Sequence, residues 1–192
     1  MSGSGKRLYL DYNASAPLLD EARDAVIYAL GIPGNPSSVH REGRAARALV
    51  EAARRSVAAL VNARPDHVFF TSGATEAAST LLTPNYMMGR SPVRLSHLYV
   101  SDTEHPCMLS GGQFAAQDIS VLPVDGNGII QLDALKTALA SHDKNQGLPL
   151  VAIQAANNET GVLSELAEIS RICSEKDILF FCDATQAVGK IE

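Results

Sequence analysis

The sequence of 192 residues has no tryptophan, few aromatic residues (5%) and no CxxC pair among its three cysteines. No apolar run approaches the ~20 residues that a membrane-spanning helix needs, and no apolar signal-peptide core follows Met1. An odd number of cysteines without a CxxC pair fits free thiols in a reducing compartment. We therefore expect a cytoplasmic protein that is neither secreted nor inserted in a membrane.

Charge of neither sign is concentrated along the chain. Sixteen lysines and arginines stand against 21 aspartates and glutamates, for a formal net charge of −5. A polynucleotide-binding protein needs a basic patch to neutralise phosphates, so no nucleic-acid partner is expected. With 46% hydrophobic and 19% charged residues the composition is that of a globular chain.

Helical and strand-like patterns alternate along the chain. Helices are expected at 19–30, 40–62, from Gly73 towards Pro84, from Pro106, at 132–141, and from Gly161 to about 176. Strands are expected at 8–12, 68–70, 98–100, 119–124, 151–156 and 178–182. This alternation predicts right-handed crossovers and an α/β fold with a mostly parallel sheet, covered by helices on both faces.

Three regions are expected along the chain. Residues 1–7 form a small polar tail that we expect to be disordered, residues 8–35 an N-terminal segment, and residues 36–192 the α/β domain. The sequence stops soon after the last expected strand, whereas a doubly wound domain typically finishes on a covering helix. The α/β domain is therefore expected to be incomplete at its carboxyl end.

Four polar clusters directly follow expected strands. They are Thr71–Glu76, Ser101–His105, Asn157–Gly161 and Asp183–Gln186. In open α/β sheets, ligands bind outside the carboxyl ends of the strands. The common position of these clusters predicts a ligand site at that edge of the sheet.

The cluster Thr71–Glu76 leads from an expected strand into a helix through Gly73. Free backbone N–H groups and the positive end of a helix favour an anion, and nearby hydroxyls add donors. The functional interpretation is a phosphate site. The alternative is an ordinary helix N-cap at Ser72 or Thr75.

In each of the other clusters, a polar side chain has either a ligand-binding role or a structural role. Asp183 follows the apolar run 178–182, so its carboxylate is either the counter-ion of a cationic ligand group or part of a cap or structural ion pair. His105 either stacks on a planar ligand and moves protons or is structural. Asn158 and Gln186 either donate to a ligand oxygen or cap turns.

Several motif-like segments lack essential parts of the motif. Gly3–Arg7 lacks the strand and the Ser/Thr of a P-loop, and Asp125–Gly128 lacks the glutamate that closes a calcium loop. His97, His105 and Cys107 do not have the spacing of a zinc site, so no metal is expected. A nucleotide-binding α/β domain is a weaker alternative, because no glycine fingerprint follows the first expected strand.

Six motifs in order make the sequence similar to the amino-terminal half of a cysteine desulfurase of the NifS/IscS kind. They are Leu10–Pro17, Gly34–Ser38, Thr71–Glu76, Thr103–His105, Asn157–Gly161 and Asp183–Lys190. Such enzymes have the class V aminotransferase fold and use pyridoxal 5′-phosphate (PLP). The resemblance extends from about residue 8 to 192 and implies the large-domain fold of PLP-dependent transferases.

The resemblance implies where the cofactor's two charged parts bind. Ala74 and Thr75, at the helix start, would bind the phosphate through backbone N–H groups and the Thr75 hydroxyl. Asp183 would pair with the protonated ring nitrogen and keep the ring an electron sink.

The resemblance also assigns the remaining polar residues. His105 would stack on the pyridine ring and, as the catalytic residue of this chain, assist proton transfers at the substrate. Asn158 and Gln186 would lie near the phenolic oxygen, and Asn158 could also contact the substrate carboxylate.

The activity that the resemblance implies for the full-length protein is conversion of L-cysteine to L-alanine with the sulfur kept as an enzyme persulfide. In the family this serves sulfur metabolism and iron–sulfur cluster assembly, through homodimers and a sulfur-acceptor protein. The family's cofactor lysine, in a Ser-x-His-Lys motif, and its persulfide cysteine lie beyond Gln186. We therefore expect this chain alone to be inactive.

Two alternative functions remain open. One is a selenocysteine lyase or other class V PLP lyase or aminotransferase. The other is an inactive fragment that acts only as an association module.

Overall fold

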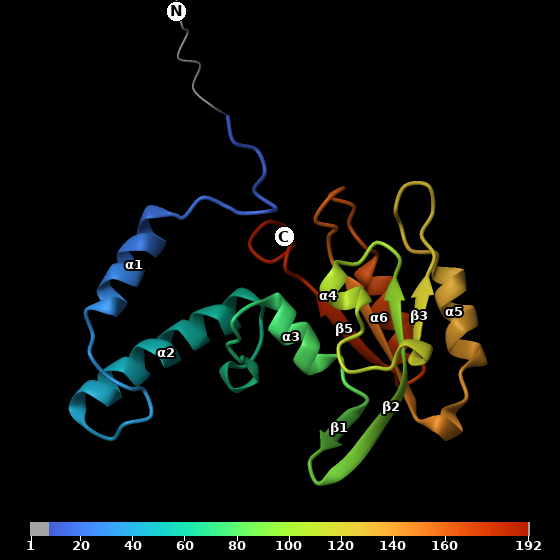
Figure 1. Ribbon diagram of the computed structural model, residues 1–192, viewed down its shortest axis with the longest axis horizontal. Coiled ribbons are helices and arrows are strands. Elements are labelled where there is room, and N and C mark those ends of the chain that lie inside the picture. The colour runs from blue at the N-terminus through green and yellow to red at the C-terminus, as the bar shows by residue number, and fades with distance from the viewer. Residues whose placement is uncertain (1–7, 192) are drawn as a thin grey trace, which may run out of the picture. The chain divides into compact units, whose positions relative to one another are not determined.

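The computed structural model describes residues 8–191, so the tail predicted to be disordered lies outside the described residues. The chain forms two compact units that divide between Phe70 and Thr71 (Figure 1). This division differs from the boundary expected after residue 35, because the 3-10 turn at Pro65–His67 packs on the long helix of the N-terminal unit. The two units are described separately.

The N-terminal unit is built from two helices. Helix α1 spans Asp20–Leu30 and α2 spans Arg41–Leu60, which confirms both predicted helices. The side chain of His40 caps α2 by accepting from the backbone N–H of Gly43 at 3.2 Å. The turn η1, Pro65–His67, follows α2.

The strands predicted at 8–12 and 68–70 do not form. Arg54 of α2 instead holds the second of these segments: it donates to the carbonyl oxygen of Val68, and its guanidinium lies 5.1 Å from the centre of the Phe70 ring. A β-prone run becomes a strand only when a neighbouring strand supplies the ladder of hydrogen bonds. Within the described residues neither segment has such a neighbour, so both predictions were wrong.

The second unit, residues 71–191 of the description, is built on a sheet of five strands. Their bounds are β1 Asn85–Met88, β2 Ser91–Ser101, β3 Ile119–Leu122, β4 Leu148–Gln154 and β5 Leu179–Asp183. Strands β3, β2, β4 and β5 are parallel neighbours in that order, and β1 is antiparallel to β2. This confirms the predicted mostly parallel sheet.

The hairpin between β1 and β2 was not predicted. Met88 pairs with Ser91 across a two-residue turn in which Gly89 has a φ of +64°. Glycine adopts this backbone conformation without strain, and such turns match the twist of the two strands that they join. Strand β2 therefore begins well before its predicted start at residue 98.

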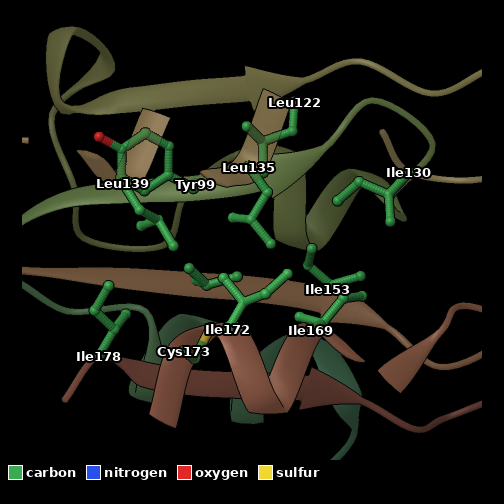
Figure 2. Packing of buried hydrophobic residues seen from close by; sticks show 11 residues of the cluster. Tyr99, Leu122, Ile130, Leu135, Leu139, Ile153, Ile169, Ile172, Cys173 and Ile178 are labelled. Atoms are coloured by element: carbon green, nitrogen blue, oxygen red, sulfur yellow. The ribbon is translucent and has the colours of Figure 1, made fainter. Parts of the chain in front are cut away.

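Helices cover the sheet on both faces, as predicted (Figure 1). One face carries α5, Leu132–Ser141, whose bounds are those predicted, and α6, Leu166–Ser174. Their apolar side chains pack on Tyr99, Val151 and Ile153 of the sheet. Figure 2 shows this core between the two helices and the strands.

The opposite face carries α3, Ala74–Leu81, and α4, Pro106–Leu109. Alternate strand residues point to this side, where Leu98, Val100 and Ala152 form a second core with side chains of the two helices. Both cores hold β2 and β4, so the carboxyl ends of these strands have fixed positions.

The connection after α4 approaches the end of α3 closely, and this contact is testable. Gly112 has a φ of +58°, and a Cβ at this position would lie 2.5 Å from the carbonyl oxygen of Leu82. Gly112→Ala should therefore lower the free energy of unfolding by about 2–4 kcal/mol, from backbone strain and overpacking together. Urea unfolding followed by circular dichroism measures this change.

The matched control is Gly126→Ala. No atom lies within 4 Å of a Cβ at Gly126, and its φ is outside the left-handed region. Its effect should stay within about 0.5 kcal/mol. Equal losses in the two variants would contradict the close approach of Gly112 to Leu82.

Candidate functional site

Three polar segments leave the sheet at the same edge. They follow β2, β4 and β5, which are parallel, so their carboxyl ends share one side of the unit. The register pairs Gln154 at the end of β4 with Asp183 at the end of β5. The backbone N–H of Ala155 then donates to the carbonyl oxygen of Asp183 at 2.8 Å. Three of the four predicted polar clusters thus follow strands at one edge, whereas Thr71–Glu76 follows a segment that is not a strand.

Two buried amides join the segment after β2 to the end of β4. Gln154 Nε2 and Asn157 Nδ2 both donate to the carbonyl oxygen of Thr103, each at 2.8 Å. Asn157 Oδ1 accepts from the backbone N–H groups of Glu159 and Thr160 at 2.9 and 2.8 Å. Neither Gln154 nor Asn157 was predicted to be important. Of the two, only Asn157 could have been noticed in the sequence, because it lies inside a predicted polar cluster.

Glu104 is a buried acid at this edge, with only 4% of its surface exposed. Its Oε1 accepts from the backbone N–H of Gln154 at 2.9 Å, whereas Oε2 is the one buried side-chain N or O atom of residues 8–191 without a hydrogen-bond partner. Burial raises the pKa of Glu104 to about 8; the Gln154 N–H opposes this rise, and the negative charge of Asp183 adds to it. Glu104 is therefore mostly protonated at pH 7.

Cys107, in α4, lies where three predicted site residues meet. Its Sγ is 3.0 Å from Nδ1 of His105. Burial raises the pKa of the Cys107 thiol, the charge of Asp183 raises it further, and the side chain of Thr75 lowers it through a hydrogen bond. Because Thr75 and Asp183 both act on one thiol, the start of α3 and the end of β5 lie on the same side of the unit.

The start of α3 has open backbone donors. The N-cap residue is Gly73, which has an extended backbone and no side chain to cap the helix, so neither Ser72 nor Thr75 is the N-cap. No atom lies within 4 Å of where a Cβ at Gly73 would be. Glu76 Oε2 accepts from the backbone N–H of Ser72 at 2.6 Å and so holds the preceding loop. Ala74 and Thr75 form the exposed first turn of the helix.

His105 and Asp183 also have capping roles. Nδ1 of His105 caps α4 by accepting from the backbone N–H of Cys107 at 3.2 Å. Oδ1 of Asp183 accepts from the N–H and the hydroxyl of Thr185 at 2.9 and 2.6 Å. These are the alternatives considered from the sequence. Each cap uses one polar atom of the side chain, and the roles toward a cofactor stay predictions.

The two predicted amides make contacts within their own loops. Asn158 Nδ2 donates to Glu159 Oε1 at 2.9 Å, and Gln186 Oε1 accepts from Nζ of Lys190. Their predicted positions near the phenolic oxygen of a cofactor stay predictions.

The thiols of the other two cysteines have raised pKa values. All three cysteines are free, and burial raises the pKa of Cys173 and Cys182 to about 11. In the described part of the chain, no three side chains of His, Cys, Asp or Glu are grouped so that they could hold a metal ion. No helix there has the length and apolar character to cross a membrane.

The effect of Asp183 on Cys107 can be measured directly. Only the thiolate reacts with alkylating reagents, so Asp183→Asn should speed alkylation of Cys107 at pH 7.5 by roughly three- to tenfold. Asparagine keeps an oxygen that can accept from Thr185. Mass spectrometry of the Cys107 peptide against time gives the rate. Asp177→Asn is the control, since this residue is exposed and asparagine tolerates its φ of +57°. Equal alkylation rates in both variants would show that the charge of Asp183 does not act on the Cys107 thiol.

Known proteins match this chain over nearly its whole length. The aminotransferase class-V family model matches residues 8–192. Human cysteine desulfurase is 39% identical over 189 residues, which cover 96% of this chain and 40% of the human protein. Among solved structures, a NifS-like protein from Rickettsia africae ESF-5 has a TM-score of 0.84 at 29% identity, covering 95% of this chain and 49% of that one. SspA in complex with cysteine has a TM-score of 0.73 at 25% identity, covering 91% and 49%.

The chain thus spans about 40% of the length of the human relative and about half of these solved structures. Class V aminotransferases and cysteine desulfurases depend on PLP. The α/β sheet matches the NifS-like structures, which confirms the predicted fold. The polar edge of the sheet lies within the matched region. The match over residues 8–192 shows that the chain belongs to the class-V aminotransferase family.

Proposed function

We propose that the complete protein is a PLP-dependent cysteine desulfurase and that the edge containing Thr75, His105 and Asp183 binds its cofactor. The observation that carries this proposal is the environment of Cys107, whose thiol is influenced by both Thr75 and Asp183 and lies 3.0 Å from Nδ1 of His105. A helix start suited to phosphate, a carboxylate suited to a cationic nitrogen and an aromatic ring therefore belong to one site.

The start of α3 fits the phosphate group of PLP. Gly73 leaves the first N–H groups of the helix without a side-chain cap, and the space beside its Cα is open. Backbone N–H groups in this position bind anions, assisted by the helix dipole. The hydroxyl of Thr75 adds a further donor at the same place.

Asp183 and His105 fit the ring of the cofactor. When bound, PLP supplies an electron sink for the substrate amino acid. A carboxylate beside the ring nitrogen would keep that nitrogen protonated, and the bonds from Thr185 hold Oδ1 of Asp183 in place. Because Nδ1 of His105 accepts from the Cys107 N–H, the neutral imidazole has its proton on Nε2. That edge of the ring would then donate or move a proton.

L-Cysteine is the proposed substrate. The matched SspA structure is a complex with cysteine, and the human relative is a cysteine desulfurase. In the proposed reaction the C–S bond of cysteine breaks and a protein thiol receives the sulfur as a persulfide. One proton passes to the carbon that becomes the methyl group of alanine. By its family resemblance, the protein would act as a homodimer and pass the sulfur to an acceptor protein. Its odd number of cysteines without a CxxC pair supports a reducing, cytoplasmic setting.

Binding of pyridoxine 5′-phosphate tests the site without chemistry at an aldehyde. Calorimetry on this chain should show binding at pH 7. Thr75→Val and Asp183→Asn should each weaken it about tenfold or more, because each removes a hydrogen bond or ion pair to a charged group. Thr80→Val is the control, since the Thr80 hydroxyl donates to a carbonyl oxygen of its own helix. Pyridoxine without phosphate should bind weakly. Unchanged affinity in both site variants would exclude this edge as the cofactor site.

Turnover tests the reaction in a form of the protein that spans the length of its relatives. It should convert L-cysteine to alanine and release sulfide when a reducing thiol is present. His105→Ala should lower kcat by roughly 10²–10⁴-fold through loss of proton transfer, whereas His67→Ala, at an exposed position of the N-terminal unit, should not. Faster turnover of L-selenocysteine would assign the protein as a selenocysteine lyase. The same assay on the present chain tests the prediction that it is inactive alone.

A further inference from the structure

Glu104 links the two residues to which the proposed function gives the main roles at the cofactor ring. It precedes His105 in the chain, and its backbone N–H donates to the Ser101 carbonyl oxygen at the end of β2 at 3.2 Å. Its Oε1 accepts from the backbone N–H of Gln154, the residue that pairs with Asp183 in the sheet. The Glu104 side chain therefore connects the His105 loop to the strand beside Asp183.

Asp183 is the charged group that acts on Glu104, and no salt bridge to Glu104 is found within residues 8–191. Asp183 and the Cys182 thiol lie on the β5 side, the Cys107 thiol lies on α4, and these groups influence one another's ionisation. β4 supplies the backbone N–H of Gln154 to Oε1, and the neutral amides of Gln154 and Asn157 bind the Thr103 carbonyl oxygen beside Glu104 in the chain. No donor reaches Oε2 within the described residues. A buried carboxylate with one unsatisfied oxygen beside a second acid is costly, and protonation removes the part of that cost that comes from the charge.

We propose that Glu104 is a positioning residue that holds a proton: as a neutral acid it ties the His105 loop to β4, beside Asp183. The use of His105 and Asp183 rests on the proposed function. The proton on Glu104 does not, because it follows from burial, the unpartnered Oε2 and the neighbouring acid.

The proton makes folding depend on pH in a defined direction. The pKa of Glu104 is about 8 in the folded chain against 4.5 for an ordinary glutamate. The folded state therefore binds more protons than the unfolded state between these values. The stabilisation is complete below the lower value and is lost as pH rises through about 8.

Urea unfolding of the full chain between pH 6 and 9 tests the proposal. In the native chain the unfolding constant should rise by up to about tenfold per pH unit from pH 6 to 8, the dependence of one proton. Glu104→Gln should remove this component, because the amide stays neutral and its oxygen can still accept from Gln154. Asp102→Asn, an exposed acid on the same loop, should keep the native dependence. The native slope in Glu104→Gln would overturn the proposal.

A measurement on the unchanged protein covers the case in which Glu104→Gln does not fold. Carbon-13 NMR of the glutamate carboxyl groups should show Glu104 protonated at pH 6.5 and titrating near pH 8. A carboxylate signal for Glu104 at pH 6.5 would overturn the proposal. Nitrogen-15 shifts of the His105 ring report the positioning role: they should be retained in Glu104→Gln and altered in Glu104→Ala. Unaltered shifts in Glu104→Ala would refute that role.

These outcomes are separate from those of the proposed function. Failure of pyridoxine 5′-phosphate to bind, with Glu104 titrating near pH 8, would reject the cofactor site and retain the neutral acid. Normal binding with Glu104 ionised at pH 6.5 would retain the cofactor site and reject the neutral acid.

Discussion

Two hydrogen bonds to the carbonyl oxygen of Thr103, from the buried amides of Gln154 and Asn157, hold the polar edge of the sheet in place. The apolar cores on the two faces hold the strands in place, but this apolar packing does not extend to the loops that follow the strands. Beyond that point the chain continues as polar loops, whose buried backbone groups must find partners. The side chains of Gln154 and Asn157 supply partners for the loop that leads to His105. The position of the imidazole therefore depends on two amides that bind the loop two residues before it.

The fold was predicted where the pattern of apolar residues decides the structure. Helix α5 has its predicted bounds, and the parallel sheet with helices on both faces followed from the alternation of periodic segments. The prediction failed where a strand depends on a partner. The segment 68–70 is apolar and β-prone, yet it contacts Arg54 of a helix and no strand. The β1–β2 hairpin was missed because a single glycine, Gly89, marks its turn.

His105, Asn158, Asp183 and Gln186 were predicted from their position at or after strands that do form. Ala74 and Thr75 were predicted from the start of a helix and from the resemblance to a family. Thr75, His105 and Asp183 do lie around one thiol. Cys107 and Glu104 were missed as parts of that arrangement, because their importance comes from burial and from charges on distant segments. A glutamate between a threonine and a histidine has no sequence mark that it is 4% exposed with an unpartnered oxygen. Such properties arise only when β2, β4 and β5 are brought together.

The capping and cofactor roles of the same side chains support each other. Capping commits Nδ1 of His105 to α4 and Oδ1 of Asp183 to Thr185. A ligand that met these groups would find them already oriented, and preorganised polar groups need no reorganisation during binding or reaction. The same reasoning explains why one of the two neighbouring acids must be neutral. If Glu104 and Asp183 were both ionised, their repulsion would push apart the loops that the amides of Gln154 and Asn157 hold together; with a proton on Glu104, the charge of Asp183 remains available to a cationic ring nitrogen.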